Sequence, residues 1–130
     1  MVGSGMVGIV LVSHSETLAQ GLRELLLPLS PAPVAAAGGT DDGLIGTSYD
    51  RIADAITSVD QGAGVVVLTD LGSAVLTAKA VLADSARPHV VLVDAPFVEG
   101  AVSAAVIAGT GADLATVRAA AEEARDVRKL

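Results

Sequence analysis

Short apolar runs alternate with segments of helical period along this chain. The apolar runs lie at residues 7–12, 34–37, 64–69 and 90–93, and valine dominates most of them, as expected for parallel strands that are buried on both faces. The segments between them carry apolar residues three and four positions apart, which is the period of an α-helix with one buried face. This alternation predicts an α/β domain with three layers, in which a four-stranded parallel sheet lies between two layers of helices.

The helices have identifiable ends. Pro28 and Pro31 end the first helix, and Thr47 or Ser48 is expected to cap the second. Gly109 and Gly111 break the fourth helix, and Asp113 is expected to cap a last one that runs to about Arg125. The helical repeats cover residues 18–29, 52–59, 74–82 and 98–106.

Parallel strands bring all their carboxyl ends to one edge of the sheet. Right-handed crossovers would collect four connecting segments there, namely residues 13–15, 38–47, 70–73 and 94–96. We therefore expect the chemistry at this edge. His89 precedes the fourth strand, so it is expected at the opposite edge in a structural or exposed role.

His14 is the candidate nucleophile. Ser13 followed three residues later by Glu16 fits a capping box, which predicts Ser13 as the N-cap and His14 as the first helical residue. Amide N–H groups at the start of a helix favour a neutral ring and can hold an attached phosphoryl group. On position alone, an incidental polar residue in a first helical turn explains His14 about as well.

The third strand ends at a second group of polar candidates. Asp70 could accept a hydrogen bond from one ring nitrogen of His14, which would fix the tautomer and leave the other nitrogen free to attack. A simple helix-start carboxylate is the alternative. The amides of Gly72 and Ser73 and the Ser73 hydroxyl could surround phosphate oxygens, although Ser73 could equally be a plain N-cap.

The composition of the chain excludes several classes of partner and of catalysis. The net charge of the 130-residue chain is −7 and it has one Phe, one Tyr and no Trp, which argues against nucleic acid and anionic membranes as partners. Without cysteine, thiolate catalysis and cysteine metal sites are excluded, and a cytoplasmic protein is expected. No apolar stretch predicts a membrane span or a signal peptide.

The basic residues also exclude one kind of enzyme. None of the eight Lys and Arg residues lies in the four edge segments, and Arg51 is the closest in sequence. A kinase that binds its own nucleotide brings Lys, Arg or metal ligands to the phosphates. An edge with one histidine, one carboxylate and backbone dipoles instead favours holding a phosphoryl group briefly and passing it on, without a cofactor or metal.

Four segments at this edge, taken in order, are similar to a known family. Residues 12–15, 39–48, 68–74 and 94–101 resemble the phosphotransfer subunits (DhaM) of phosphoenolpyruvate-dependent dihydroxyacetone kinases. These are relatives of the mannose-class enzyme IIA domains of the sugar phosphotransferase system. The resemblance covers nearly all of residues 7–114, and it implies the strand order 2-1-3-4.

The resemblance also implies roles and partners. It makes His14 the histidine phosphorylated on Nε2, Asp70 its hydrogen-bonding partner, and Ser13, Gly39, Gly72 and Ser73 the surround of the phosphate. The phosphoryl group would come from the phosphocarrier HPr and go to ADP bound on a DhaL subunit, which acts with the dihydroxyacetone-binding subunit DhaK. Family members tend to be homodimers, and helix 98–108 is a possible interface.

Domain organisation and two alternative functions complete the expectations. Residues 6–130 are expected to form one domain, with residues 1–5 a native extension or a remnant of expression. One alternative function is a mannose-class sugar-transport enzyme IIA. The other, from a different class, is a flavodoxin-like module that binds a nucleotide or flavin at the same edge.

Overall fold

The sheet is parallel and its strand order is the expected one. The computed structural model describes residues 5–130, so most of the segment interpreted as an extension lies outside the described residues. The strands pair in the order β2-β1-β3-β4. They are β1 (Gly8–Ser13), β2 (Val34–Gly38), β3 (Val65–Thr69) and β4 (Val90–Leu92).

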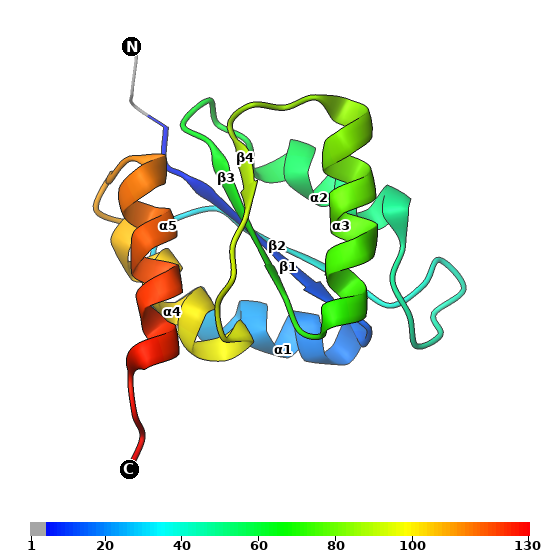
Figure 1. Cartoon of the computed structure of the whole chain (residues 1–130), viewed down its shortest axis with the longest axis horizontal. Coiled ribbons are helices and arrows are strands. Elements are labelled where there is room, and N and C mark those ends of the chain that lie inside the picture. The colour runs from blue at the N-terminus through cyan, green and yellow to red at the C-terminus, as the bar shows by residue number, and fades with distance from the viewer. Residues whose placement is uncertain (1–4) are drawn as a thin grey trace.

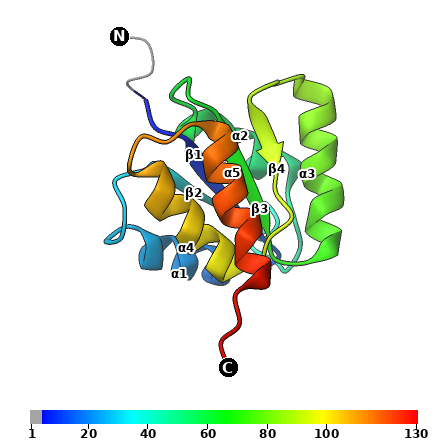
Figure 2. The ribbon, with the colours of Figure 1, turned by 60° about the vertical axis from the view of Figure 1, so that its left-hand side comes forward.

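Helices cover both faces of this sheet (Figures 1 and 2). On one face lie α1 (Glu16–Leu26), α4 (Phe97–Ala108) and α5 (Leu114–Glu123), and on the other lie α2 (Tyr49–Val59) and α3 (Gly72–Ser85). A 3₁₀ turn, η1 (Ala124–Asp126), follows α5. The prediction of a three-layer α/β domain with strand order 2-1-3-4 is confirmed.

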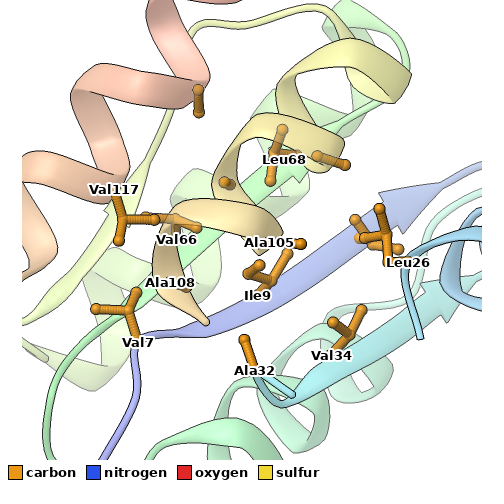
Figure 3. Packing of buried hydrophobic residues seen from close by; sticks show 14 of the residues in the cluster. Val7, Ile9, Leu26, Ala32, Val34, Val66, Leu68, Ala105, Ala108 and Val117 are labelled. Atoms are coloured by element: carbon orange, nitrogen blue, oxygen red, sulfur yellow. The ribbon is translucent and has the colours of Figure 1, made fainter. Parts of the chain in front are cut away.

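The core divides along the pleat of the sheet. Ile9 and Leu11 of β1 are fully buried on the side of α1, α4 and α5, whereas Val10 and Val12 are fully buried on the side of α2 and α3. Figure 3 shows Ile9 next to Ala105 of α4 in the first of these layers. Small side chains on α4 let that helix approach the strands closely, which explains a core with almost no aromatic residues.

The start of α1 differs from the prediction. β1 continues through Ser13, and α1 begins at Glu16 with Ser15 as its N-cap, whose hydroxyl accepts a hydrogen bond from the Leu18 amide at 3.2 Å. The prediction that Ser13 caps the helix and His14 opens it is therefore wrong. Spacing favoured Ser13 because Glu16 follows it by three residues, but the side chain of Ser13 has a different partner, Asp70.

The caps of the other helices bear on the site. Ser48 caps α2 and Asp113 caps α5, as predicted. At the start of α3 the N-cap is Leu71, and no side chain accepts a hydrogen bond from its first turn. The Ala74 amide donates to the Leu71 carbonyl at 3.0 Å, so the amides of Gly72 and Ser73 are the ones left for another acceptor. In residues 5–130, none of the helices combines the length and the apolar character that crossing a bilayer requires.

Candidate functional site

The imidazole of His14 lies between two strand ends. His14 follows β1, Asp70 follows β3, and these strands are neighbours at the centre of the sheet. The Nδ1 atom of His14 is 3.0 Å from Oδ1 of Asp70. The two side chains are 20% and 10% exposed respectively, so the pair is largely sheltered from water while the ring keeps one accessible side. The predicted pairing of His14 with Asp70 is present in the structure.

The carboxylate of Asp70 accepts four hydrogen bonds. Oδ1 takes the Leu71 amide at 2.7 Å as well as the ring of His14, and Oδ2 takes the His14 amide at 3.0 Å and the Ser13 hydroxyl at 2.9 Å. Burial raises the pKa of Asp70, but these donors outweigh it and lower the pKa below its usual value. Asp70 is therefore an ionised acceptor whose lone pairs are all occupied, so it orients the ring and is not free to act as a base.

The tautomer of His14 follows from this arrangement. An ionised carboxylate can only accept, so Nδ1 carries a hydrogen, and in the neutral form of the ring Nε2 then carries the lone pair. Ser73 Oγ lies 2.7 Å from Nε2, and its hydroxyl therefore donates to that nitrogen. The nucleophilic lone pair thus points at the first turn of α3, where the amides of Gly72 and Ser73 have no side-chain cap.

The six predicted site residues fall into two groups. Asp70 and Ser73 are hydrogen-bonded to the two ring nitrogens of His14, and Gly72 precedes Ser73 at the start of α3. Ser13 is fully buried. Its hydroxyl donates to Asp70 and accepts from the Ser15 amide at 3.0 Å, so Ser13 lies behind the Asp70 carboxylate. The N–H of Gly39 is taken by the Ser13 carbonyl at 3.1 Å, so that glycine shapes a loop and its N–H is not available to a phosphate.

Two arginines reach the edge from elsewhere in the chain; sequence reasoning had named Arg51 only as the closest basic residue and had given Arg125 no place at the edge. Arg51 Nη1, from the first turn of α2, donates to the Gly38 carbonyl at 3.0 Å. Arg125 Nη1, after α5, donates to Oδ2 of Asp94 at 2.8 Å. Position in a first helical turn was the available signal for Arg51, whereas nothing local pointed to Arg125. Across residues 5–130, no Lys or Arg is hydrogen-bonded or ion-paired to His14, Asp70 or Ser73.

Exposed aliphatic side chains flank the histidine. Leu44 and Ile45, from the loop after β2, are 65% and 76% exposed, and Leu71, which follows Asp70, is 59% exposed. The Gly46 amide donates to the His14 carbonyl at 2.9 Å, which holds the loop against the site. Large apolar residues in connecting loops were the sequence signal for this rim. Such exposure beside a nucleophile suits contact with another protein.

Chemically, the site can bind and transfer one group. A neutral imidazole with a fixed tautomer is a nucleophile, and a hydroxyl with two helix-start amides can stabilise an anion attached to it. No cluster of three His, Cys, Asp or Glu side chains that could hold a metal ion occurs within the described part of the chain.

Comparison with known proteins agrees with the fold. Residues 8–118 match the EIIA-man family, described as PTS system fructose IIA component. A solved structure titled "Crystal structure of unknown function protein EF1359" superposes with a TM-score of 0.82 at 35% identity, over 91% of this chain and 94% of that one.

Several curated relatives are named DhaM subunits of dihydroxyacetone kinases. The phosphoryl donor subunit DhaM of PEP-dependent dihydroxyacetone kinase 2 from Listeria innocua is 37% identical, over 78% of this chain and 85% of that protein. DhaM of the PTS-dependent kinase from Lactococcus lactis is 32% identical, over 85% and 89%. DhaM from Escherichia coli is 40% identical over 84% of this chain, which spans 25% of that longer protein. The chain therefore belongs to the EIIA-man family of phosphotransferase system components, among the DhaM phosphoryl donor subunits.

Proposed function

We propose that this chain is a phosphocarrier of a dihydroxyacetone kinase, which accepts a phosphoryl group on Nε2 of His14 and passes it on. One observation carries the proposal. The His14 ring is held between Asp70 at Nδ1 and Ser73 at Nε2, so the reactive nitrogen faces the uncapped start of α3. The names of the relatives supply the reaction in which such a carrier takes part.

The first transfer is a displacement at phosphorus. The Nε2 lone pair attacks the phosphorus of a phosphohistidine on the donor, which we take to be HPr, and the new N–P bond forms as the old one breaks. The electron pair of the broken bond returns to the ring of the donor. Asp70 stabilises the positive charge that develops on the ring through the Nδ1–H bond.

The second transfer reverses these roles. A terminal oxygen of ADP, which we propose is bound on a DhaL subunit that works with DhaK, attacks the phosphorus. The bond to Nε2 then breaks and its electron pair returns to His14. In the interval, Ser73 turns its hydroxyl from Nε2 to a phosphoryl oxygen, and the first-turn amides of α3 offer further donors.

The alternatives fit less well. A sugar-transport enzyme IIA would use the same chemistry, but the relatives reported above are named as kinase subunits. A flavin module needs flat apolar walls, and the chain has only one Phe and one Tyr. Tyr49, at the start of α2, donates its hydroxyl to Asp84 of α3 at 2.8 Å. We also propose a cytoplasmic homodimer, although α4 turns most of its small residues into the monomer core.

Labelling tests the proposal directly. Incubation with phosphoenolpyruvate, enzyme I and HPr should add one phosphoryl group that is labile in acid and stable in base. His14→Ala should abolish the labelling, and His89→Ala, which changes the only other histidine of the chain, should retain it. Labelling that persists in His14→Ala contradicts the proposal. Discharge by a DhaL subunit with ADP, but not by a sugar-specific IIB protein, identifies the acceptor.

A further inference from the structure

The loop after β2, residues 39–48, is built to hold one shape. We call it the edge loop. The Thr40 amide donates to the Leu44 carbonyl at 2.9 Å, and the Leu44 amide donates to Thr40 Oγ1 at 3.0 Å. Gly39, Gly43 and Gly46 have φ angles of 71°, 79° and 146°, which side chains disfavour. These internal hydrogen bonds hold the ten-residue connection in one conformation, as is typical of functional loops of this length.

One guanidinium joins the two ends of the edge loop to the sheet. Arg51 Nη1 donates to the carbonyl of Gly38, the last residue of β2, and lies 3.7 Å from Oε1 of Glu16 on α1. Its Nε lies 3.6 Å from Oδ1 of Asp41 in the loop. The same carboxylate oxygen accepts the hydroxyl of Ser48 at 2.6 Å. Arg51 therefore links β2, α1 and both ends of the edge loop.

The tip of the edge loop is apolar and borders the nucleophile. Leu44 and Ile45 are its exposed apolar side chains, and the next residue, Gly46, donates its amide to the His14 carbonyl. Leu71 flanks His14 from the opposite side, because β2 and β3 lie on either side of β1. We therefore expect a protein that brings a phosphoryl group to Nε2 to contact this apolar rim.

We propose that Arg51 is a positioning residue that holds the edge loop in a docking-ready shape, so that Leu44 and Ile45 receive the protein that donates the phosphoryl group. This inference rests on the proposed function and adds the recognition element and the residue that orders it. A loop that is already ordered loses little conformational freedom on binding, so the arrangement acts on affinity for the partner.

The charged residues around the tip indicate the chemistry of the partner's surface. Asp41, Asp42 and Glu16 are exposed beside it, and Arg51 pairs with Asp41 and Glu16, so these four residues carry a net charge of −2 (three carboxylates and one guanidinium) in a chain that carries −7. A matching partner presents an apolar patch rimmed by basic residues around its phosphohistidine. We propose that the protein that binds this surface is the phosphoryl donor. The acceptor must reach the same nitrogen and would use the same face in its turn.

Two arginines from different helices donate to carbonyls of the same strand, β2, and provide a matched test. Arg23 Nε donates to the Val34 carbonyl at 2.9 Å, at the other end of β2 from the site. Arg51→Ala and Arg23→Ala each remove one positive charge and one guanidinium-to-carbonyl bond from this strand. With phosphorylated HPr as donor, Arg51→Ala should raise KM about tenfold with kcat within about twofold. Arg23→Ala should leave both within about twofold. An unchanged KM in Arg51→Ala, or equal rises in both variants, overturns the proposal.

Two more variants keep the test decisive if Arg51→Ala folds poorly. Arg51→Lys retains the charge but cannot bridge Gly38 and Asp41 with a planar fork, so its KM should also rise. A KM equal to that of the wild type would assign Arg51 a purely electrostatic role. Ile45→Ser changes an exposed side chain, so it should raise KM without lowering the free energy of unfolding. No effect of Ile45→Ser contradicts the docking tip.

Hydrogen exchange separates this inference from the proposed function. Amide exchange of residues 39–48 should be faster in Arg51→Ala than in the wild type and unchanged in Arg23→Ala, whether or not the protein accepts a phosphoryl group. If the wild type takes no label, the proposed function fails while exchange still tests the positioning role. If labelling succeeds and exchange in the edge loop is the same in all three proteins, the role of Arg51 fails alone.

Discussion

Replacing Asp70 with asparagine should disable phosphoryl transfer while preserving the shape of the side chain. Four donors converge on the Asp70 carboxylate, and an amide can accept with only one of its two terminal atoms. If the new NH₂ group takes the place of Oδ1, it faces the Leu71 amide and Nδ1 of His14. The ring would then move its hydrogen to Nε2 and lose the lone pair that attacks.

The opposite orientation is also unfavourable. With NH₂ in place of Oδ2, it faces the backbone amide of His14, and the Ser13 hydroxyl must turn round to accept. Either way one backbone N–H loses its partner, which costs about 1–3 kcal/mol of the free energy of unfolding. Because at least part of the population holds the wrong tautomer, and the developing charge on the ring loses its counterion, transfer should slow by about 10²–10⁴-fold.

Rapid-quench measurement of phosphoryl transfer from phosphorylated HPr, with urea unfolding of the same samples, tests this prediction. Asp94→Asn is the matched control, because Asp94 follows β4 at the same edge but its side chain is 85% exposed and pairs only at the surface with Arg125. The control should transfer at nearly the rate of the wild type. The reasoning is refuted if Asp70→Asn stays within about threefold of the wild-type rate, or if both variants slow equally.

Three further predictions follow from the same structure. Ser73→Ala should slow phosphoryl transfer and shorten the lifetime of the phosphorylated protein by about tenfold, because a phosphoryl oxygen loses a hydrogen-bond donor. A time course of labelling measures both quantities. Equal lifetimes in the variant and the wild type would show that Ser73 does not contact the phosphate. The lowered pKa of Asp70 stabilises the fold above the ordinary carboxyl value of 3.8, and this contribution is lost as pH falls through the lower folded-state value. Urea unfolding should therefore show a steeper loss of stability below about pH 4 in the wild type than in Asp70→Asn, and parallel curves would contradict it. Gly8→Ala should lower the free energy of unfolding by about 1–3 kcal/mol, because a Cβ there would clash with the Val59 carbonyl oxygen. Gly21→Ala in α1, with open space around it, should raise that free energy by about 0.5–1 kcal/mol in the same assay.

Sequence alone predicted the layers because apolar periodicity reports burial directly. Runs such as residues 64–69 are buried on both faces, and that pattern has few structural solutions. The pairing of His14 with Asp70 was also predictable, since parallel strands bring their carboxyl ends to one edge. The strand order and the phosphate roles came from the resemblance, because periodicity does not say which strands are neighbours.

Contacts between side chains that are far apart in the sequence could not be predicted from local sequence patterns. Ser13 and Ser15 both suit an N-cap, and the choice between them depends on Asp70, which lies 57 residues away from Ser13. Arg51 was identified only as the basic residue closest in sequence to the edge segments, because its bond to the Gly38 carbonyl depends on how the loop between them folds back. The tip residues Leu44 and Ile45 carried an apolar signal, but their role depends on how the loop meets His14, which no periodic pattern encodes.

The position of the phosphoryl group on the His14 ring tests the central claim most directly. The hydrogen bond from Nδ1 to Asp70 leaves only Nε2 free to attack. Nuclear magnetic resonance of the protein labelled with ¹⁵N in histidine and phosphorylated through HPr resolves the two ring nitrogens. We predict a phosphorus coupling at Nε2 of His14, with Nδ1 still protonated. A phosphoryl group on Nδ1, or on any residue other than His14, would contradict the account.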